Sequence, residues 1–369
     1  MKVSSIRRSS SLPDLRHLKA LRSNSSLTVP RKGGSPWLTL ILDDGGCVLY
    51  KPDEGKIKRC PGDFSGTRFL ASYGNWLLML DLATSSMYMI DVFREKRINL
   101  PPLEFLVSCT SSLRRVIGSD REFIWNYPDG YHCELTTNDL RGRFWVDDKG
   151  EEFLVVWYFD CPPSYLFFCK KGDRGHSVIP LREEGVPKLY NGLIDLALWG
   201  YRLYMVTTRR YIRVMDLSGQ QGFRDVTEDP PRVMRSPFGA ERCSNIAVTG
   251  AGELLLVDST VRNVENGRRF GLYKMDPEAD PYDTYADLLE VDSLGDEALF
   301  LDLGITLPAN PSLGIEPNSI YFTQHYRPRL RVPYKLDVCV YNLATKTFKR
   351  FPYLDNFHLK DARWFLPVA

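Results

Sequence analysis

Short apolar runs separated by tight polar turns make up most of the chain from residue 36 onward. The first two, Trp37–Leu42 and Cys47–Tyr50, flank the turn sequence DDGG, which is a strong signal for a β-hairpin. Similar pairs of runs follow at 75–82 and 87–93, 152–159 and 164–169, 201–206 and 211–217, 253–258 and 270–275, and 320–323 and 336–343. Helical periodicity is nearly absent from this part of the chain, so the pattern predicts an all-β fold.

The hairpin units repeat at intervals that are mostly of the size of a propeller blade. They begin near residues 37, 75, 152, 201, 252 and 319. The long interval between the second and third units leaves room for a further one, whose best strand candidate is Glu122–Tyr127. We therefore predict a single β-propeller over residues 35–369, with six blades preferred and seven as the alternative. A closed ring of blades also leaves few exposed sheet edges.

Residues 294–323 contain two further strand signals around a segment rich in Pro, Gly and Asn. Ala298–Asp302 and Ser319–Thr323 are predicted to be strands, and Leu307–Pro317 is predicted to be a surface crossing without helix or strand. Only Tyr282–Val291 and Leu354–Lys360 have weak helical patterns. The globular part is therefore expected to contain at most two short helices.

The sequence LGDEALFL at 294–301, followed by a Pro/Ser/Gly link and PNSIYFT at 317–323, resembles the signature of the KIB-type β-propellers. This is a plant family with kelch-like, F-box-associated members. GNWLLMLD at 74–81 and ARWFLP at 362–367 follow the family's usual order. The resemblance implies the substrate-recognition domain of an F-box ubiquitin-ligase receptor, with a protein target held on one face. Some relatives are thought to restrain a plant protein kinase, so a kinase is one candidate target.

Charge divides the chain into a basic tail and an acidic remainder. Met1–Gly34 has a net charge of +7, and the whole chain has +2, so residues 35–369 carry −5. An acidic globular part argues against nucleic-acid binding. No apolar run approaches the roughly 18 residues that a membrane span requires. Eight cysteines without a C-x-x-C pair indicate reduced thiols in an intracellular protein of the nucleus or cytoplasm.

The basic tail permits three interpretations. Its composition is typical of a disordered segment. It also has the Arg and Ser content of a transit peptide, which would make the protein an organellar, mitochondrial propeller. The sequence LPDLRHLKALRS at 12–23 resembles the second half of a plant F-box. Half of a helical bundle cannot bury a complete core, so this F-box-like stretch is not expected to bind the ligase adaptor.

Motifs for catalysis, metal ions and cofactors are missing from the sequence. The five histidines are scattered, and no zinc spacing, phosphate-binding loop or G-x-S-x-G motif occurs. We therefore predict no catalytic residues, no metal site, no cofactor and no enzyme activity. Propellers can also be glycosidases that use carboxylates near the ring axis, so a carbohydrate-active enzyme is the remaining alternative.

Two groups of residues are candidates for contact with a protein partner. Trp125 and Tyr127 precede the turn PDG, where aromatic side chains can anchor a partner, although a place in the core is the simpler interpretation. The segment QHYRPRLRVPYK at 324–335 carries Arg327, Arg329 and Arg331 at alternating positions. In an extended segment these arginines share one face, and we expect them to contact an acidic or phosphorylated partner unless the loop is merely solvated.

Overall fold

Strands account for nearly all the regular structure of this protein. The computed structural model describes residues 8–9, 34–60, 63–107, 110–116, 118, 122–147, 149–160, 165–181, 188–220, 222–234, 243–261, 268–280, 288–323 and 338–367. Within these ranges the only helices are short 3-10 turns, η2 (Thr137–Asp139), η3 (Lys188–Tyr190), η4 (Pro311–Leu313) and η5 (Pro352–Asn356). The predicted all-β class is confirmed.

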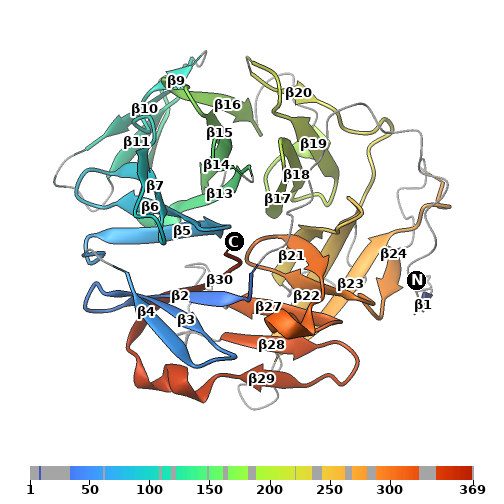
Figure 1. The fold of residues 1–369 in the computed structure, drawn as a ribbon. Helices are drawn as coiled ribbons and strands as arrows, with labels where there is room; N and C mark the ends of the chain where they lie inside the picture. Colours follow the sequence, from blue (N-terminus) through green and yellow to red (C-terminus); the bar gives the residue numbers. More distant parts are fainter. Residues whose placement is uncertain are drawn as a thin grey trace.

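Four sheets each form one blade of a ring, with the strands in order from the axis outward (Figure 1). Blade 1 contains β30 (Leu359–Phe365), β2 (Trp37–Leu42), β3 (Cys47–Lys51) and β4 (Lys56–Arg59). Blade 2 contains β5 (Thr67–Tyr73), β6 (Trp76–Asp81), β7 (Ser86–Asp91) and β8 (Arg97–Asn99). Blade 3 contains β13 (Leu140–Val146), β14 (Phe153–Phe159), β15 (Tyr165–Lys170), β16 (His176–Pro180) and an outer β9 (Leu106–Val107). Blade 4 contains β17 (Asp195–Trp199), β18 (Arg202–Val206), β19 (Ile212–Asp216) and β20 (Arg224–Asp225).

A ten-stranded sheet supplies the other two blades, which meet through the single residue pair Val248 and Ile305. Blade 5 contains β21 (Cys243–Val248), β22 (Leu254–Val261), β23 (Arg268–Met275), β24 (Leu288–Val291) and an outer β1 (Arg8–Ser9). Blade 6 contains β26 (Ile305–Pro308), β25 (Glu297–Phe300), β27 (Ser319–Thr323), β28 (Val338–Asn342) and β29 (Phe348–Arg350). The fold is therefore a propeller of six blades, as the repeat spacing predicted.

The two ends of the ring meet inside blade 1. Its innermost strand, β30, comes from the far end of the sequence and pairs antiparallel with β2, from Trp37 opposite Phe365 to Leu42 opposite Leu359. Trp364 and Phe365 of β30 are 1% and 0% exposed. This pairing closes the ring because it satisfies an inner edge that would otherwise lack backbone partners.

A separate three-stranded sheet occupies the long connection between blades 2 and 3. It consists of β10 (Ser112–Arg115), β11 (Phe123–Asn126) and β12 (His132–Leu135). The interval that was left open for a further unit thus contains a small sheet, with β11 inside the predicted strand Glu122–Tyr127. It packs between the two blades (Figure 1), because Phe123 and Trp125 belong to their common core.

Three expectations for local structure were wrong. Pro352–Asn356 is a 3-10 turn and Leu359 begins strand β30, where a helix was expected over Leu354–Lys360. A helix was also expected over Tyr282–Val291. Its last four residues, Leu288–Val291, form a strand that pairs with the edge of β23, and the other residues lie outside the described part of the chain. The crossing at 307–317 includes the end of β26, which folds back onto β25 and so satisfies its backbone groups.

The hydrophobic core consists of layers between neighbouring blades. One cluster joins blades 2 and 3 and includes Trp157, which is 0% exposed. Gly142 of β13 lies at this contact, because a Cβ atom added there would be 2.7 Å from Leu78 Cδ2 of β6. A side chain at this position would therefore displace the Leu78 side chain in this packed layer.

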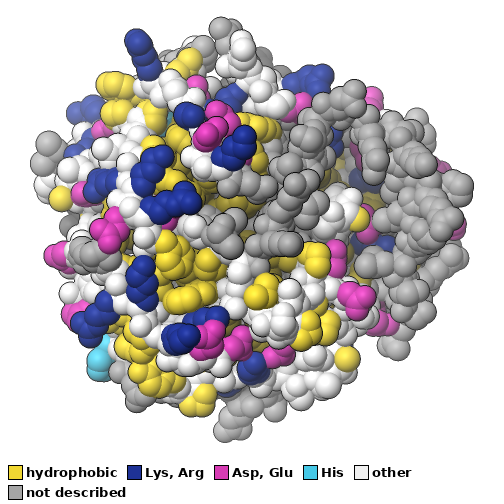
Figure 2. Space-filling model, viewed as in Figure 1, with side chains coloured by type: hydrophobic (Ala, Val, Ile, Leu, Met, Phe, Trp, Pro, Cys, Tyr) yellow, Lys and Arg dark blue, Asp and Glu magenta, His cyan; other side chains and the backbone are white. Residues whose placement is uncertain are grey.

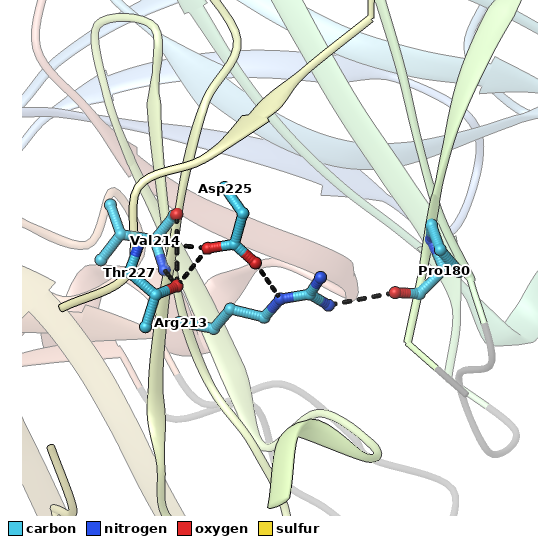
Figure 3. Close-up of polar contacts among 5 residues, drawn as sticks. All are labelled: Pro180, Arg213, Val214, Asp225 and Thr227. Atoms are coloured by element: carbon cyan, nitrogen blue, oxygen red, sulfur yellow. Dashed lines mark hydrogen bonds and ion pairs between the residues drawn. The ribbon is translucent and has the colours of Figure 1, made fainter. Parts of the chain in front are cut away.

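Arg213 links blade 3 to blade 4 through polar contacts (Figure 3). Its side chain is 7% exposed; Nε donates to Asp225 Oδ2 at 3.0 Å, and Nη1 donates to Pro180 O at 3.0 Å. Burial opposes ionisation of Asp225, but hydrogen bonds from Thr227 and the Arg213 guanidinium together lower the pKa of this carboxyl. Arg213 therefore connects β19 of blade 4 to β16 of blade 3.

Replacing Arg213 with methionine should lower the free energy of unfolding by about 1–3 kcal/mol, because Asp225 and the Pro180 carbonyl lose their donor. The matched control is Arg224→Met, eleven residues further along at a site whose side chain is 76% exposed, where we expect less than about 0.5 kcal/mol. Urea unfolding measures both. Equal effects in the two variants would contradict a structural role for Arg213.

Candidate partner-binding face

One face of the ring collects the hairpin turns between the second and third strands of the blades. The starts of the inner strands lie at the same end, because Thr67 pairs with Asp81 and Leu140 pairs with Phe159. In blade 1, Leu359 pairs with Leu42, directly before the DDGG turn. We call this end of the ring the loop face. The described turns at 43–46, 82–85 and 207–211 lie there, so this face presents several surface loops.

The small sheet β10–β12 extends the loop face between blades 2 and 3. The Arg115 guanidinium donates to Ala83 O in the turn after β6, which anchors β10 to blade 2. Thr137 donates to Glu122 through its backbone N–H at 3.0 Å and its Oγ1 at 2.9 Å. These contacts hold both ends of the small sheet against the propeller.

Trp125 lies in the core and not on the surface. It is 3% exposed, and its ring centroid is 4.6 Å from that of Tyr165 and 5.4 Å from that of Phe167. Its Nε1 is buried and has no hydrogen-bond partner among the described residues. The simpler sequence interpretation, a core aromatic, matches this position; direct contact of Trp125 with a partner stays a prediction.

Tyr127 continues the aromatic row outward and is half-buried. Its ring lies 6.3 Å from Trp125 and 5.6 Å from Tyr131, which is 66% exposed. Tyr131 was not singled out from the sequence, although it directly follows the PDG turn that drew attention to Tyr127. The row thus leads from a buried tryptophan to an exposed tyrosine, an arrangement suited to anchoring a partner.

Arg327, Arg329 and Arg331 lie outside the described residues. The strands on either side are described, and Thr323 pairs with Val338 at the end of the β27–β28 hairpin. This hairpin end corresponds to the turn between second and third strands in the other blades. The predicted role of the three arginines remains a prediction.

The residues described here contain no group of three or more His, Cys, Asp or Glu side chains that could hold a metal ion. None of the described helices is long and apolar enough to cross a membrane. On the face shown in Figure 2, Lys and Arg side chains are concentrated over blades 1 to 3, with hydrophobic side chains visible among them near the centre. Such a mixture of basic and apolar groups is suited to contact with a macromolecule.

The family model described as the KIB1-4 beta-propeller matches residues 49–342, which is most of the chain. This chain belongs to the KIB1-4 β-propeller family. The suspected resemblance to the KIB-type propellers is thereby confirmed.

Curated relatives of this KIB-type propeller are F-box proteins of Arabidopsis thaliana. The F-box protein At5g25290 is 44% identical over 353 residues, which cover 91% of this chain and 86% of the relative. The F-box protein At2g14290 is 45% identical over 351 residues, covering 93% and 88%. The F-box protein KIB3 is 30% identical over 364 residues, covering 90% and 73%. The similarity extends over most of the propeller in each case.

The KIB-type propeller also contains four arginines on its inner strands. They are Arg68 on β5, Arg141 and Arg143 on β13, and Arg363 on β30. These strands are neighbours around the axis of the ring (Figure 1). Burial lowers the pKa of Arg68 to about 10, and the Arg141 charge adds to this effect. Sequence reasoning missed this arginine cluster because its members are far apart along the chain.

Proposed function

We propose that this protein is a non-catalytic receptor that holds a protein partner on the loop face of its propeller. The observation that carries the proposal is membership of a propeller family whose relatives here are named F-box proteins. An F-box protein couples a recognition domain to a ubiquitin ligase, so the propeller is the part expected to choose the target. The partner we infer is a protein with an acidic or phosphorylated surface.

The domain organisation that accompanies this proposal is a tail over residues 1–34 and a propeller over residues 35–369. We propose that the tail does not hold the ligase adaptor, since 12–23 corresponds to only half of an F-box-like bundle. Recognition is then a property of the propeller. Capture of a partner by a chain that begins at residue 35 is expected to equal capture by the full chain.

The decisive experiment is affinity purification of the tagged full chain from plant cells, followed by identification of the captured proteins. The test variant changes Arg327, Arg329 and Arg331 together to glutamate. The matched control, Lys56→Glu, Lys58→Glu and Arg59→Glu, makes the same charge change on the exposed outer strand of blade 1. We expect the test variant to lose at least tenfold of the partner and the control to retain it, because arginine forks bind carboxylate and phosphate groups.

Three results would count against the proposal. Equal capture by the wild-type chain and the test variant would show that the arginine segment does not contribute to partner binding. Absence of any specific partner, together with hydrolysis of a glycoside that depends on one carboxylate of this chain, would favour the carbohydrate-active alternative. A fluorescent fusion of residues 1–34 that enters mitochondria would favour the organellar alternative.

A further inference from the structure

The arginine cluster brings four positive side chains to the inner strands of blades 1, 2 and 3. Arg68 lies one residue from the start of β5, and Arg141 lies one residue from the start of β13, so both are at the loop face. Arg143 follows two positions later on the same face of β13, since side chains alternate along a strand. Burial lowers the pKa of Arg363 on β30, and the nearby charges of Arg143 and Arg141 add to this lowering.

Two members of the cluster are held by backbone carbonyls near η2. The Arg68 guanidinium donates to Thr137 O. The Arg141 Nη1 donates to Asn138 O at 2.7 Å and to Leu140 O at 3.0 Å, and its Nη2 is 3.7 Å from Asp160 Oδ2. These two side chains therefore have defined partners in the folded chain.

The other two arginines have unused donors. The Nε of Arg143 and the Nε of Arg363 are both buried and have no hydrogen-bond acceptor among the residues that the structure describes. The Arg363 Nε is 3.9 Å from Asp361 Oδ1, too far for a hydrogen bond, and its guanidinium lies 5.6 Å from the centre of the Phe69 ring. A buried donor without a partner lowers the stability of a protein by about 1–3 kcal/mol. A ligand that supplies an acceptor to these two Nε atoms would therefore be bound favourably.

Two carboxylates near the cluster also accept hydrogen bonds from groups outside it. Asp302 accepts from Thr323 Oγ1 at 2.8 Å and from the Trp364 N–H at 3.2 Å, while Asp361 accepts from the Ala362 N–H at 2.8 Å. Asp139 lies near Arg68, and Asp160 lies near Arg141. The formal charges of four arginines and four aspartates balance, but Arg143 has no ion pair among the described residues.

We propose that Arg143 and Arg363 bind the phosphate group of a phosphomonoester, with Arg68 and Arg141 as flanking charges. A guanidinium presents two parallel N–H groups that match two oxygens of a phosphate. Two such forks, on the strands β30 and β13 that lie on either side of β5, fit a dianion better than one carboxylate. The Arg363 side chain is 16% exposed and that of Arg141 is 22% exposed, so solvent reaches the cluster. This site can be tested without knowing the protein partner.

The test is calorimetric titration of the full chain with inorganic phosphate, O-phospho-L-serine and acetate at constant ionic strength. We expect saturable binding of both phosphates, with acetate at least tenfold weaker. The double variant Arg143→Gln/Arg363→Gln should bind phosphate at least tenfold more weakly, and Arg224→Gln on the exposed edge of blade 4 should bind as the wild type does. Phosphate binding that is absent, or equal in the double variant, would overturn the proposal.

Stability separates a ligand site from a structural role. Without phosphate, Arg143→Gln should unfold at a temperature no lower than the wild type, because the change removes a buried Nε donor that has no acceptor among the described residues. Added phosphate should raise the unfolding temperature of the wild type and leave that of the double variant unchanged. A large fall in the unfolding temperature of Arg143→Gln without ligand would show a structural role and overturn the proposal.

A charge-preserving variant and a peptide complete the test. Arg143→Lys keeps the charge but loses the fork, so it should fold normally and bind phosphate several-fold more weakly. A short phosphoserine peptide that binds at least tenfold more tightly than inorganic phosphate would assign the site to a phosphorylated protein side chain. Equal binding of peptide and phosphate would assign it to a free phosphorylated molecule; either result supports the site.

Discussion

Ending the chain at residue 358 should unfold the entire ring and not only blade 1. The truncation removes β30, which pairs with β2 along its whole length and places Trp364 and Phe365 at 1% and 0% exposure. Each large buried side chain contributes about 2 kcal/mol or more, and β2 would also lose its inner backbone partners. That loss is comparable with the total stability of a typical domain, about 5–15 kcal/mol.

Circular dichroism and urea unfolding measure this effect. The control ends the chain at residue 367, which keeps all of β30, and should retain the cooperative transition of the full chain. A chain ending at residue 358 that keeps the β spectrum and a cooperative transition near that of the control would show that the ring does not depend on closure by β30.

Acidification below about pH 6.5 should destabilise the protein through His176, which is 0% exposed. Its Nδ1 accepts from Trp157 Nε1 at 3.0 Å, and its Nε2 is 3.1 Å from Pro101 O, so Nε2 carries the proton of a neutral ring. Burial lowers the pKa of His176 from 6.5 to about 4. Between pH 6.5 and about 4, the unfolded chain therefore binds a proton at His176 that the folded chain does not bind.

The sign and size of the effect follow from this difference in proton uptake. Full stability is present above the unfolded pKa of about 6.5, and it is lost progressively as the pH falls toward the folded pKa of about 4. The loss from this one group approaches about 3 kcal/mol. His176→Gln removes the titration, so its stability should fall less between pH 6.5 and 4, although it starts lower at pH 7 because the fit to Trp157 is poorer.

The matched control is His132→Gln, at an exposed histidine of β12. It should keep the pH dependence of the wild type. Urea unfolding at several pH values gives the comparison. Identical pH dependence in the wild type and His176→Gln would contradict a buried neutral His176.

Local sequence patterns determined the repeated hairpins and hence the all-β class. The unit starts read from the sequence, near 37, 75, 152, 201 and 252, coincide with the second strand of blades 1 to 5, and the start near 319 coincides with β27 of blade 6. These strands are continuous apolar runs because both faces pack against neighbouring blades, so each run is visible without knowledge of the tertiary structure. Cys169 and Cys339 lie in such apolar runs, and both are 0% exposed.

Tertiary structure alone decided the inner strands and the residues near the axis. β30 is a strand because β2 offers it backbone partners from the opposite end of the chain, and β26 is a strand because it folds back on β25. Trp125 is buried because β11 inserts between two blades, which no local pattern shows. Arg68, Arg143 and Arg363 are separated by at least 75 residues, so only ring closure makes them neighbours.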